Sequence, residues 1–175
     1  TKAGYLLSLV NEKELQKILR YVQDPKEFRS PFGIRSLSKY HEAHPFIYKE
    51  TQVGYEPGHS AHRIKGGNSN WRGPIWFPTN YLLLQSLKVF AQEENGELRI
   101  DETCRSIARS LISLFLPDKA GVRPIFRDFP QAKDPHFSDL LLFHEFFHAE
   151  TGEGLGASHQ TGWTGLVANL IDEFR

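Results

Sequence analysis

The sequence predicts a mainly α-helical fold, with long loops gathered where a site could form. Apolar residues recur at one-face helical spacing in several segments, and helix-start and helix-stop residues flank those segments. Stretches that alternate apolar and polar residues, as strands do, are few. Long turn-rich segments separate the predicted helices, and a long loop inside a compact domain usually carries function. We therefore expect helices that support a site built from loops.

The first predicted helix begins at Asn11. Glu14 follows three residues later, which is the spacing of a capping box. Pro25 ends the helical periodicity. The expected buried face of this helix carries Leu15, Ile18, Leu19 and Val22.

A second helix is predicted to open at Pro78 or Thr79 and to run to about Gln92. Asn95-Gly96 is the expected end signal, because both residues tolerate the backbone that follows a helix. The expected buried stripe consists of Leu82, Leu83, Leu87 and Phe90.

Two more helices are expected towards the end of the chain. Asp101 is the predicted N-cap of the third helix, and Pro117 stops it. A last amphipathic helix is predicted over Thr161 to Phe174, whereas the apolar run Leu140 to Phe147 reads equally as helix or strand. The third helix is expected to turn inward Cys104, Ile107, Ala108, Leu111, Ile112 and Phe115.

Composition excludes several classes of function. The 175 residues suffice for one domain with a core, and their formal net charge of zero gives no field that would attract nucleic acid or an anionic membrane. The apolar runs are too short for a membrane-spanning helix. The single Cys104 excludes an internal disulfide and a Cys-based zinc site. The chain has no Met and no basic n-region of a secretory leader, which predicts a fragment of a longer polypeptide and favours a cytoplasmic location.

The segment Gly66 to Asn80 is the most informative part of the chain. It places two Trp, one Arg and three Asn in a turn-rich stretch before a helix. Aromatic faces beside amides and a guanidinium suit a sugar, because sugar C–H faces lie on rings and hydroxyls bond to planar donors. Two of these residues could instead have structural roles: Arg72 could stabilise the loop, and Asn80 could cap the helix. The expected sugar subsite is lined by Trp71, Arg72, Trp76 and Asn80.

A second segment, Glu145 to Thr164, has a similar character. It is a Gly-rich turn that contains His159, Gln160 and Trp163 and leads into an apolar helix. We expect these three side chains either to help bind the sugar or to hold the loop. Trp163 also falls on the apolar stripe of the last helix, so it can equally be a core residue.

His144, Glu145 and His148 match the H-E-x-x-H pattern. On a helix this spacing places two imidazoles one turn apart, where they can bind Zn²⁺ with the Glu as base. The sequence indicates no third zinc ligand, so we favour the interpretation that the two His residues line the wall of a site without binding a metal. Glu145 lies among Phe residues, surroundings that suit proton transfer, although composition alone favours a surface ion pair.

The two segments together resemble glycoside hydrolase family 63, the family of mannosyl-oligosaccharide glucosidase. The resemblance rests on GGNSNWRGPIWFPTNYLL (Gly66 to Leu83), GEGLGASHQTGWTGLVA (Gly152 to Ala168) and VGYEPG (Val53 to Gly58), and it extends from about Ile34 to the C-terminus. It implies an (α/α)6 toroid with the site at its mouth. It also implies inverting hydrolysis of an α-glycosidic bond, which uses two carboxyl groups roughly 6.5–9.5 Å apart.

The resemblance assigns the general base to Glu145 and no role to a cofactor or a metal. The family's general acid is an Asp in an upstream segment that this chain lacks. Residues 1–175 would then be the C-terminal portion of a catalytic domain, inactive by itself because the leaving oxygen must be protonated. The remainder of the domain or a second copy would cover its open helix faces. A zinc peptidase and a non-catalytic carbohydrate-binding fragment are the alternative functions.

Overall fold

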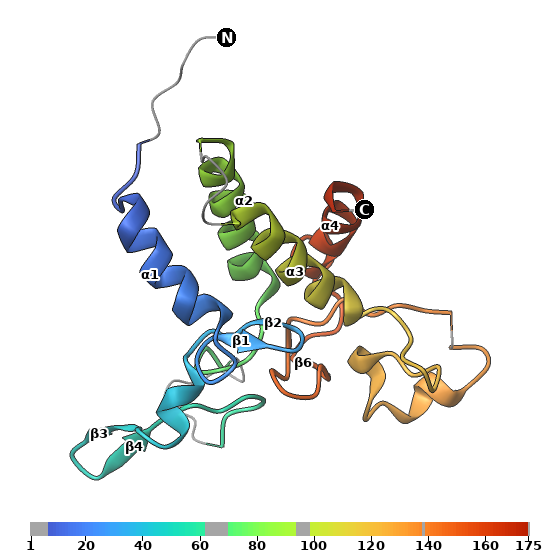
Figure 1. Ribbon diagram of the computed structural model, residues 1–175. Helices are drawn as coiled ribbons and strands as arrows, with labels where there is room; N and C mark the ends of the chain where they lie inside the picture. The colour runs from blue at the N-terminus through green and yellow to red at the C-terminus, as the bar shows by residue number, and fades with distance from the viewer. Residues whose placement is uncertain (1–6, 62–69, 94–98, 138, 175) are drawn as a thin grey trace.

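The computed structural model describes residues 7–61, 70–93, 99–137 and 139–174. Helices form its core, and three small two-stranded sheets lie beside them (Figure 1), so the mainly α expectation is met in part and the fold is mixed. The α-helices of the described residues are α1 (Glu12–Gln23), α2 (Phe77–Glu93), α3 (Ile100–Ser113) and α4 (Val167–Glu173). The strands are β1 (Arg29–Ser30), β2 (Gly33–Ile34), β3 (Phe46–Tyr48), β4 (Thr51–Val53), β5 (Phe146–Phe147) and β6 (Gly154–Leu155).

Helix α1 has the predicted capping box. The backbone N–H of Asn11 donates to Glu14 Oε2 at 2.8 Å, and the backbone N–H of Glu14 donates to Asn11 Oδ1 at 3.1 Å. The expected face is buried at Leu15, Leu19 and Val22, while Ile18 remains 43% exposed at its flank. Local chemistry therefore sets the start of this helix, and its apolar face docks it onto the core.

Helix α2 begins at Phe77, within two residues of the predicted start. Its inward stripe agrees with the prediction at Leu87, which is buried, but Leu84 is buried where Leu82 was expected, and Leu82 is 66% exposed. Three consecutive Leu residues allow more than one helical face, so periodicity alone could not choose between them. The predicted end at Asn95-Gly96 lies outside the described residues.

Helix α3 has the predicted inward face, with Cys104, Ile107 and Leu111 fully buried. The predicted cap at Asp101 is wrong, because the helix already includes this residue and its N-cap is Arg99 in the left-handed region at φ 49°. Asp101 instead lies in the first turn, where a negative charge is favourable near the helix N-terminus.

Helices α2, α3 and α4 form the centre of the molecule. Helix α2 packs against α3, and α4 packs beside both of them, since Lys88 on α2 pairs with Glu173 on α4 (Figure 1). Apolar residues of all four helices join one buried cluster, as Leu19, Leu84, Leu111 and Leu170 illustrate. The last helix is shorter than predicted, because Thr164–Leu166 forms a 3-10 turn before α4. None of the described helices has the length and apolar character needed to span a bilayer.

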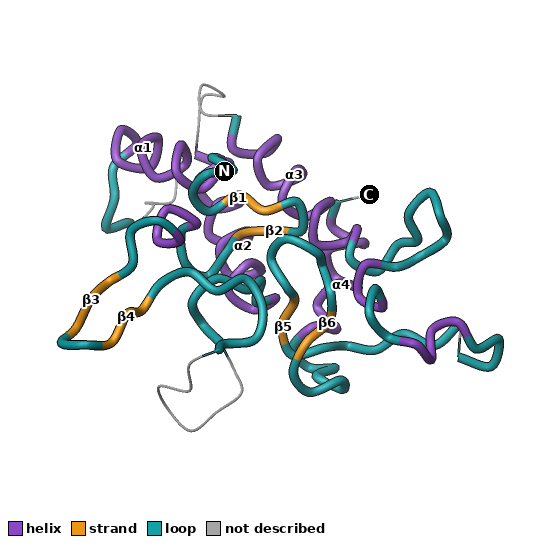
Figure 2. The backbone as a smooth tube through the Cα atoms, turned by 90° about the horizontal axis from the view of Figure 1, so that it is seen from below, coloured by secondary structure: helices purple, strands orange, loops and turns teal. Residues whose placement is uncertain are grey.

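Four extended segments lie side by side below the helices. Arg35, just after β2, pairs with Ile75, and Ile75 pairs with Phe147 of β5. Strand β5 then pairs with β6 in the register Phe147↔Gly154, and Figure 2 shows β5 and β6 next to β2. The ambiguous run at 140–147 is therefore extended chain, not helix. This pairing brings the two sequence segments of interest together.

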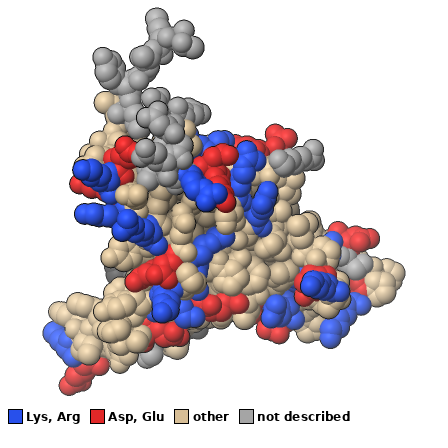
Figure 3. Space-filling view, in the orientation of Figure 1, with Lys and Arg blue, Asp and Glu red and all other residues tan. Residues whose placement is uncertain are grey.

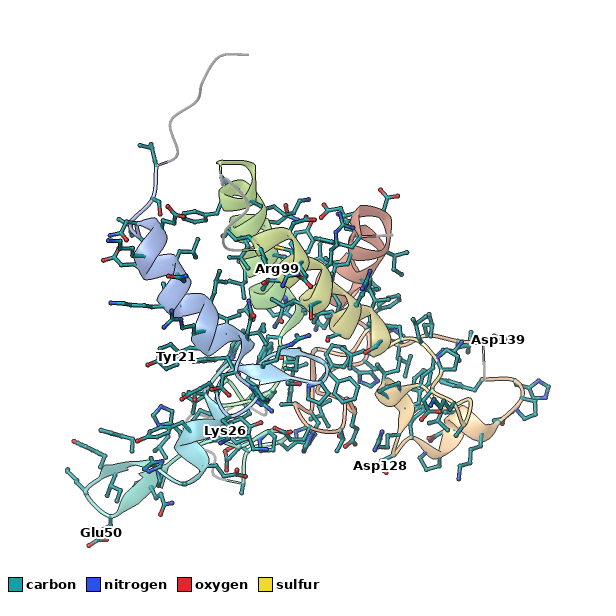
Figure 4. The ribbon with its side chains drawn as sticks, viewed as in Figure 1. Tyr21, Lys26, Glu50, Arg99, Asp128 and Asp139 are labelled. Carbon is teal, nitrogen blue, oxygen red and sulfur yellow. The ribbon has the colours of Figure 1, made fainter. Side chains whose placement is uncertain are left out.

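Charged side chains of both signs are mixed over the visible surface (Figure 3), in agreement with the zero net charge. Two regions project from the body. One is the β3–β4 hairpin, with Glu50 at its tip, and the other is the segment that carries Asp128 and Asp139 (Figure 4). Both projections lie away from the paired segments around β5 (Figure 2).

Candidate active site

A stack of aromatic rings forms a second, smaller core beside β5. Trp76 and Phe146 are buried and stack with ring centroids 4.9 Å apart, and Trp163 meets Trp76 edge-on at 6.2 Å. Trp71 stacks on Trp76, with the two ring centroids 3.7 Å apart and an interplanar angle of 6°. Trp71 is 48% exposed, so it presents an aromatic surface to solvent.

Buried Asn70 holds this stack in place. Its backbone carbonyl accepts a hydrogen bond from Trp76 Nε1 at 3.0 Å. Its side-chain amide donates to the carbonyls of Glu56 and Gly58 at 2.9 and 2.8 Å, and its Oδ1 accepts from the backbone N–H of Arg72 at 3.0 Å. This role of Asn70 could not be predicted, since nothing in the local sequence distinguishes its amide from those of Asn68 and Asn80.

Arg72 forms an ion pair with Glu56 beside the stack. Ser60 Oγ lies 2.6 Å from both the Glu56 carboxylate and the Arg72 guanidinium. Burial acts to raise the pKa of Glu56, but hydrogen bonds from Ser60 and Arg72 outweigh it and hold that pKa below its ordinary value. Arg72 thus contacts Glu56 and Ser60 within this loop, and its guanidinium remains partly exposed next to Trp71.

Glu145 lies directly before β5, at the edge of the aromatic stack. Its backbone N–H donates to the Ala157 carbonyl at 2.8 Å, and its own carbonyl accepts from Trp163 Nε1 at 3.0 Å. Its Oε2 accepts from the backbone N–H of Ala157 at 3.3 Å. A Cβ at Gly156 would lie 2.6 Å from this oxygen, and Gly156 has φ 72°, so glycine is required there. The carboxylate is therefore held, half-buried, against the β6 loop.

The H-E-x-x-H segment is not helical. It runs through β5, and an extended chain separates residues four apart by about 13 Å, at roughly 3.3 Å per residue. The zinc-site hypothesis requires the two His side chains to lie one helical turn apart, and this extended segment does not provide that spacing. His144 is buried, and its ring nitrogens have no hydrogen-bond partner among the described residues. Burial, followed by repulsion from His159, lowers the pKa of His144 below its ordinary value.

The other predicted sugar-binding residues occupy different positions. Asn80 is 1% exposed, and its amide is engaged with the backbone of Ile34 and with the Trp76 carbonyl at 2.7–3.0 Å. This corrects its expected role to a clamp between β2 and α2. His159 and Gln160 pair with the chain at Phe143, two residues before Glu145. Trp163 contacts both Glu145 and the aromatic stack.

A buried ion-pair network fixes the turn that follows β5. Glu150 Oε1 accepts from Arg35 Nη2 at 2.9 Å, from Arg35 Nε at 3.1 Å and from Tyr55 OH at 2.6 Å. Burial acts to raise the pKa of Glu150, but the hydrogen bonds from Tyr55 and Arg35 hold it below its ordinary value. Burial is also the main cause that raises the pKa of Tyr55. This network could not be predicted from local sequence patterns, because its members lie far apart along the chain.

Comparison with known proteins identifies the family. The model of the glycosyl hydrolase family 63 C-terminal domain matches residues 5–173. The chain belongs to glycosyl hydrolase family 63. Across 96% of its length it is 44% identical to the uncharacterized protein YMR196W of Saccharomyces cerevisiae. It is also similar to the probable mannosyl-oligosaccharide glucosidase of Schizosaccharomyces pombe, with 29% identity over 91% of the chain.

A further relative is the mannosyl-oligosaccharide glucosidase of Saccharomyces cerevisiae, with 24% identity over 94% of the chain. This family 63 chain spans only 17%, 15% and 16% of these three proteins, respectively. The comparisons therefore concern the C-terminal domain alone. They agree with the resemblance noted for the segments 66–83 and 152–168, and the structure brings residues 70–83 and 152–168 together at the aromatic stack.

Proposed function

We propose that this chain is the C-terminal part of an inverting α-glycosidase, in which Glu145 is the general base. The observation that carries the proposal is the contact between the two segments: Trp163 Nε1 donates to the Glu145 carbonyl at 3.0 Å while its ring packs on Trp76. The bond places the backbone of Glu145 beside an aromatic group whose exposed member, Trp71, offers a surface of the kind that receives a sugar ring. The base removes a proton from water as that water attacks the anomeric carbon.

The reaction needs a second carboxyl group. In inverting hydrolysis this group protonates the leaving oxygen from a position roughly 6.5–9.5 Å from the base, which leaves room for the water. Because the chain spans about one-sixth of its relatives, we assign the general acid to another part of the full-length protein. The isolated chain would then be inactive, and its helices would complete an (α/α)6 toroid with those of the remaining domain.

Exposed apolar side chains support this completion. Leu82 and Val89 on α2 are 66% and 47% exposed, and Leu116 after α3 is 53% exposed. Leaving such residues in water forgoes the stabilisation that burial provides. We propose that the remainder of the catalytic domain covers these faces, or that a second copy of the chain does so. The substrate is an α-glucosidic oligosaccharide or a smaller glucoside, in line with the names of two relatives.

The stereochemistry of the product tests the function. The full-length protein is mixed with an α-glucoside, and the first-formed sugar is followed by NMR before mutarotation equalises the anomers. We expect the β-anomer, because water activated by Glu145 attacks from the face opposite the leaving group. Release of the α-anomer would overturn the inverting mechanism. Binding without any hydrolysis would favour the carbohydrate-binding alternative instead.

Replacing Trp71 tests the sugar-binding surface. We expect Trp71→Ala in the full-length protein to raise KM about twofold to tenfold with little change in kcat, because an aromatic stacking contact contributes about 0.5–1.5 kcal/mol to binding in both ground and transition states. Steady-state kinetics measures both constants. Tyr21→Ala is the matched control, since Tyr21 is 58% exposed on α1 (Figure 4), away from the stack. An unchanged KM for Trp71→Ala would remove Trp71 from the subsite.

A further inference from the structure

His148 closes the turn between β5 and β6 with its side chain. Its Nδ1 accepts hydrogen bonds from the backbone N–H groups of Glu150 and Thr151, both at 3.2 Å. Its backbone N–H donates to the Glu153 carbonyl at 2.8 Å, and its carbonyl accepts from the Gly152 N–H at 2.9 Å. One residue thus makes four bonds within a single hairpin loop.

The neighbouring loop fixes the ring itself. A Cβ at Gly58 would lie 2.5 Å from His148 Cδ2, so the imidazole packs directly on that backbone. The next residue, Ala149, donates its N–H to the Pro57 carbonyl at 2.8 Å. The ring therefore has a defined place between the turn and the loop that follows β4.

We propose that His148 is a positioning residue for Glu145, which it places by fixing the register of the β5–β6 hairpin. In a hairpin the turn sets the register, and a slip of one residue turns every side chain to the opposite face. Glu145 precedes β5, and its Oε2 meets the backbone of Ala157 just after β6. A change in register would therefore move the carboxylate away from the aromatic stack. The inference rests on the proposed function of Glu145.

The contact requires a neutral ring. Nδ1 can accept two N–H groups only when it carries no proton, so the tautomer has its proton on Nε2. Burial lowers the pKa of His148 below its ordinary value; Glu153 and Glu150 in the same hairpin oppose this effect, and His59 in the facing loop adds to it. Acidification through this range converts Nδ1 into a donor that faces two donors, and the turn loses both bonds.

The variant His148→Asn distinguishes the effect of the hydrogen-bond acceptor from the effect of protonating the imidazole ring. The Asn Oδ1 is attached at the same side-chain position as Nδ1, accepts hydrogen bonds and does not titrate. His148→Ala removes the acceptor at every pH. Comparing the two variants with the wild-type full-length protein therefore isolates the acceptor from the mere presence of a ring.

Hydrogen exchange followed by mass spectrometry on peptides spanning 149–153 gives the first measurement. After correction for intrinsic rates, we expect His148→Ala to exchange the Glu150 and Thr151 amides about fivefold to tenfold faster at about pH 7.5, because each amide loses a hydrogen bond. Because burial lowers the pKa of His148, the wild type should show the same acceleration only at about pH 4.5, two units below the ordinary imidazole pKa, and His148→Asn should not. Equal protection in all three proteins at both pH values would overturn the proposal.

Kinetics gives the second measurement. We expect kcat of His148→Ala to fall by about 100-fold with KM little changed, as small displacements of a catalytic group do, and His148→Asn to restore it. Faster exchange together with unchanged kcat in an active enzyme would overturn the positioning role. If the full-length protein hydrolyses no α-glucoside, the proposed function is wrong. The hydrogen-exchange measurement still tests whether His148 Nδ1 accepts the two backbone hydrogen bonds.

Discussion

Glu145→Gln in the full-length protein is expected to lower kcat by about 100-fold to 10,000-fold, the range that general acid–base catalysis contributes. KM should change little, because the base acts on water in the transition state and the sugar surface remains intact. The amide oxygen of Gln can still accept the hydrogen bond that Glu145 Oε2 receives from Ala157. The variant thus removes the charge with the least disturbance of the loop. Steady-state kinetics on an α-glucoside measures both constants.

Two further variants serve as controls for this experiment. Glu102→Gln makes the same chemical change at a carboxylate that is 65% exposed on α3 and pairs with Arg99, and it should leave kcat unaffected. Glu145→Ala should recover turnover when azide is supplied, because this anion attacks without needing a base to remove a proton. Full activity of Glu145→Gln, or loss of activity in Glu102→Gln as well, would contradict the assignment of the base.

Local chemistry explains which elements of the fold could be predicted. Asn11 and Glu14 fix the start of α1 through bonds three residues apart, and the inward face of α3 follows from one clear apolar stripe. Where several faces were equally apolar, as at Leu82 to Leu84, only packing against α3 and the 3-10 turn before α4 chose the inward residue. Sequence spacing contains no such information.

The candidate site was predictable in composition but not in geometry. The two Trp-bearing segments were identified from their residue types, and the pairing of Ile75 with Phe147 brings them together. The same pairing makes the segment after His144 extended, which spacing alone could not decide. Asn80 was misassigned because a buried clamp and a ligand contact use the same amide chemistry. Only the three-dimensional partners distinguish these roles.

Long-range ion pairs left no sequence signal, and Arg35 is the clearest example. It is 4% exposed, and besides Glu150 it bonds the carbonyls of Pro25 and Glu27 at 3.1 and 3.2 Å. The network joins three parts of the chain: the end of α1, the loop after β4 through Tyr55, and the turn after β5. It therefore ties the turn of the Glu145 hairpin to the body of the domain.

Arg35→Met should consequently destabilise the domain by about 2–4 kcal/mol. Breaking a buried pair by removing one partner costs about 3–5 kcal/mol, and the 30% exposure of the Glu150 side chain reduces this through solvent screening. The midpoint of thermal unfolding of the full-length protein, followed by calorimetry, measures the change. Arg105→Met is the matched control, because its pair with Asp101 is exposed on α3 and should contribute less than about 1 kcal/mol.

The pH dependence separates the ion pair from simple packing. The pKa of Glu150 is lowered in the folded protein, so its contribution to stability is complete above the unfolded value of about 4.3 and is lost as the pH falls through the folded value. We therefore expect the stability difference between the wild type and Glu150→Gln to shrink below about pH 4.3. Arg35→Met should show the same trend, since both variants remove the same charged pair. A difference that stays constant with pH would mean that Arg35 acts by filling space, and the hairpin would then be held by its backbone bonds alone.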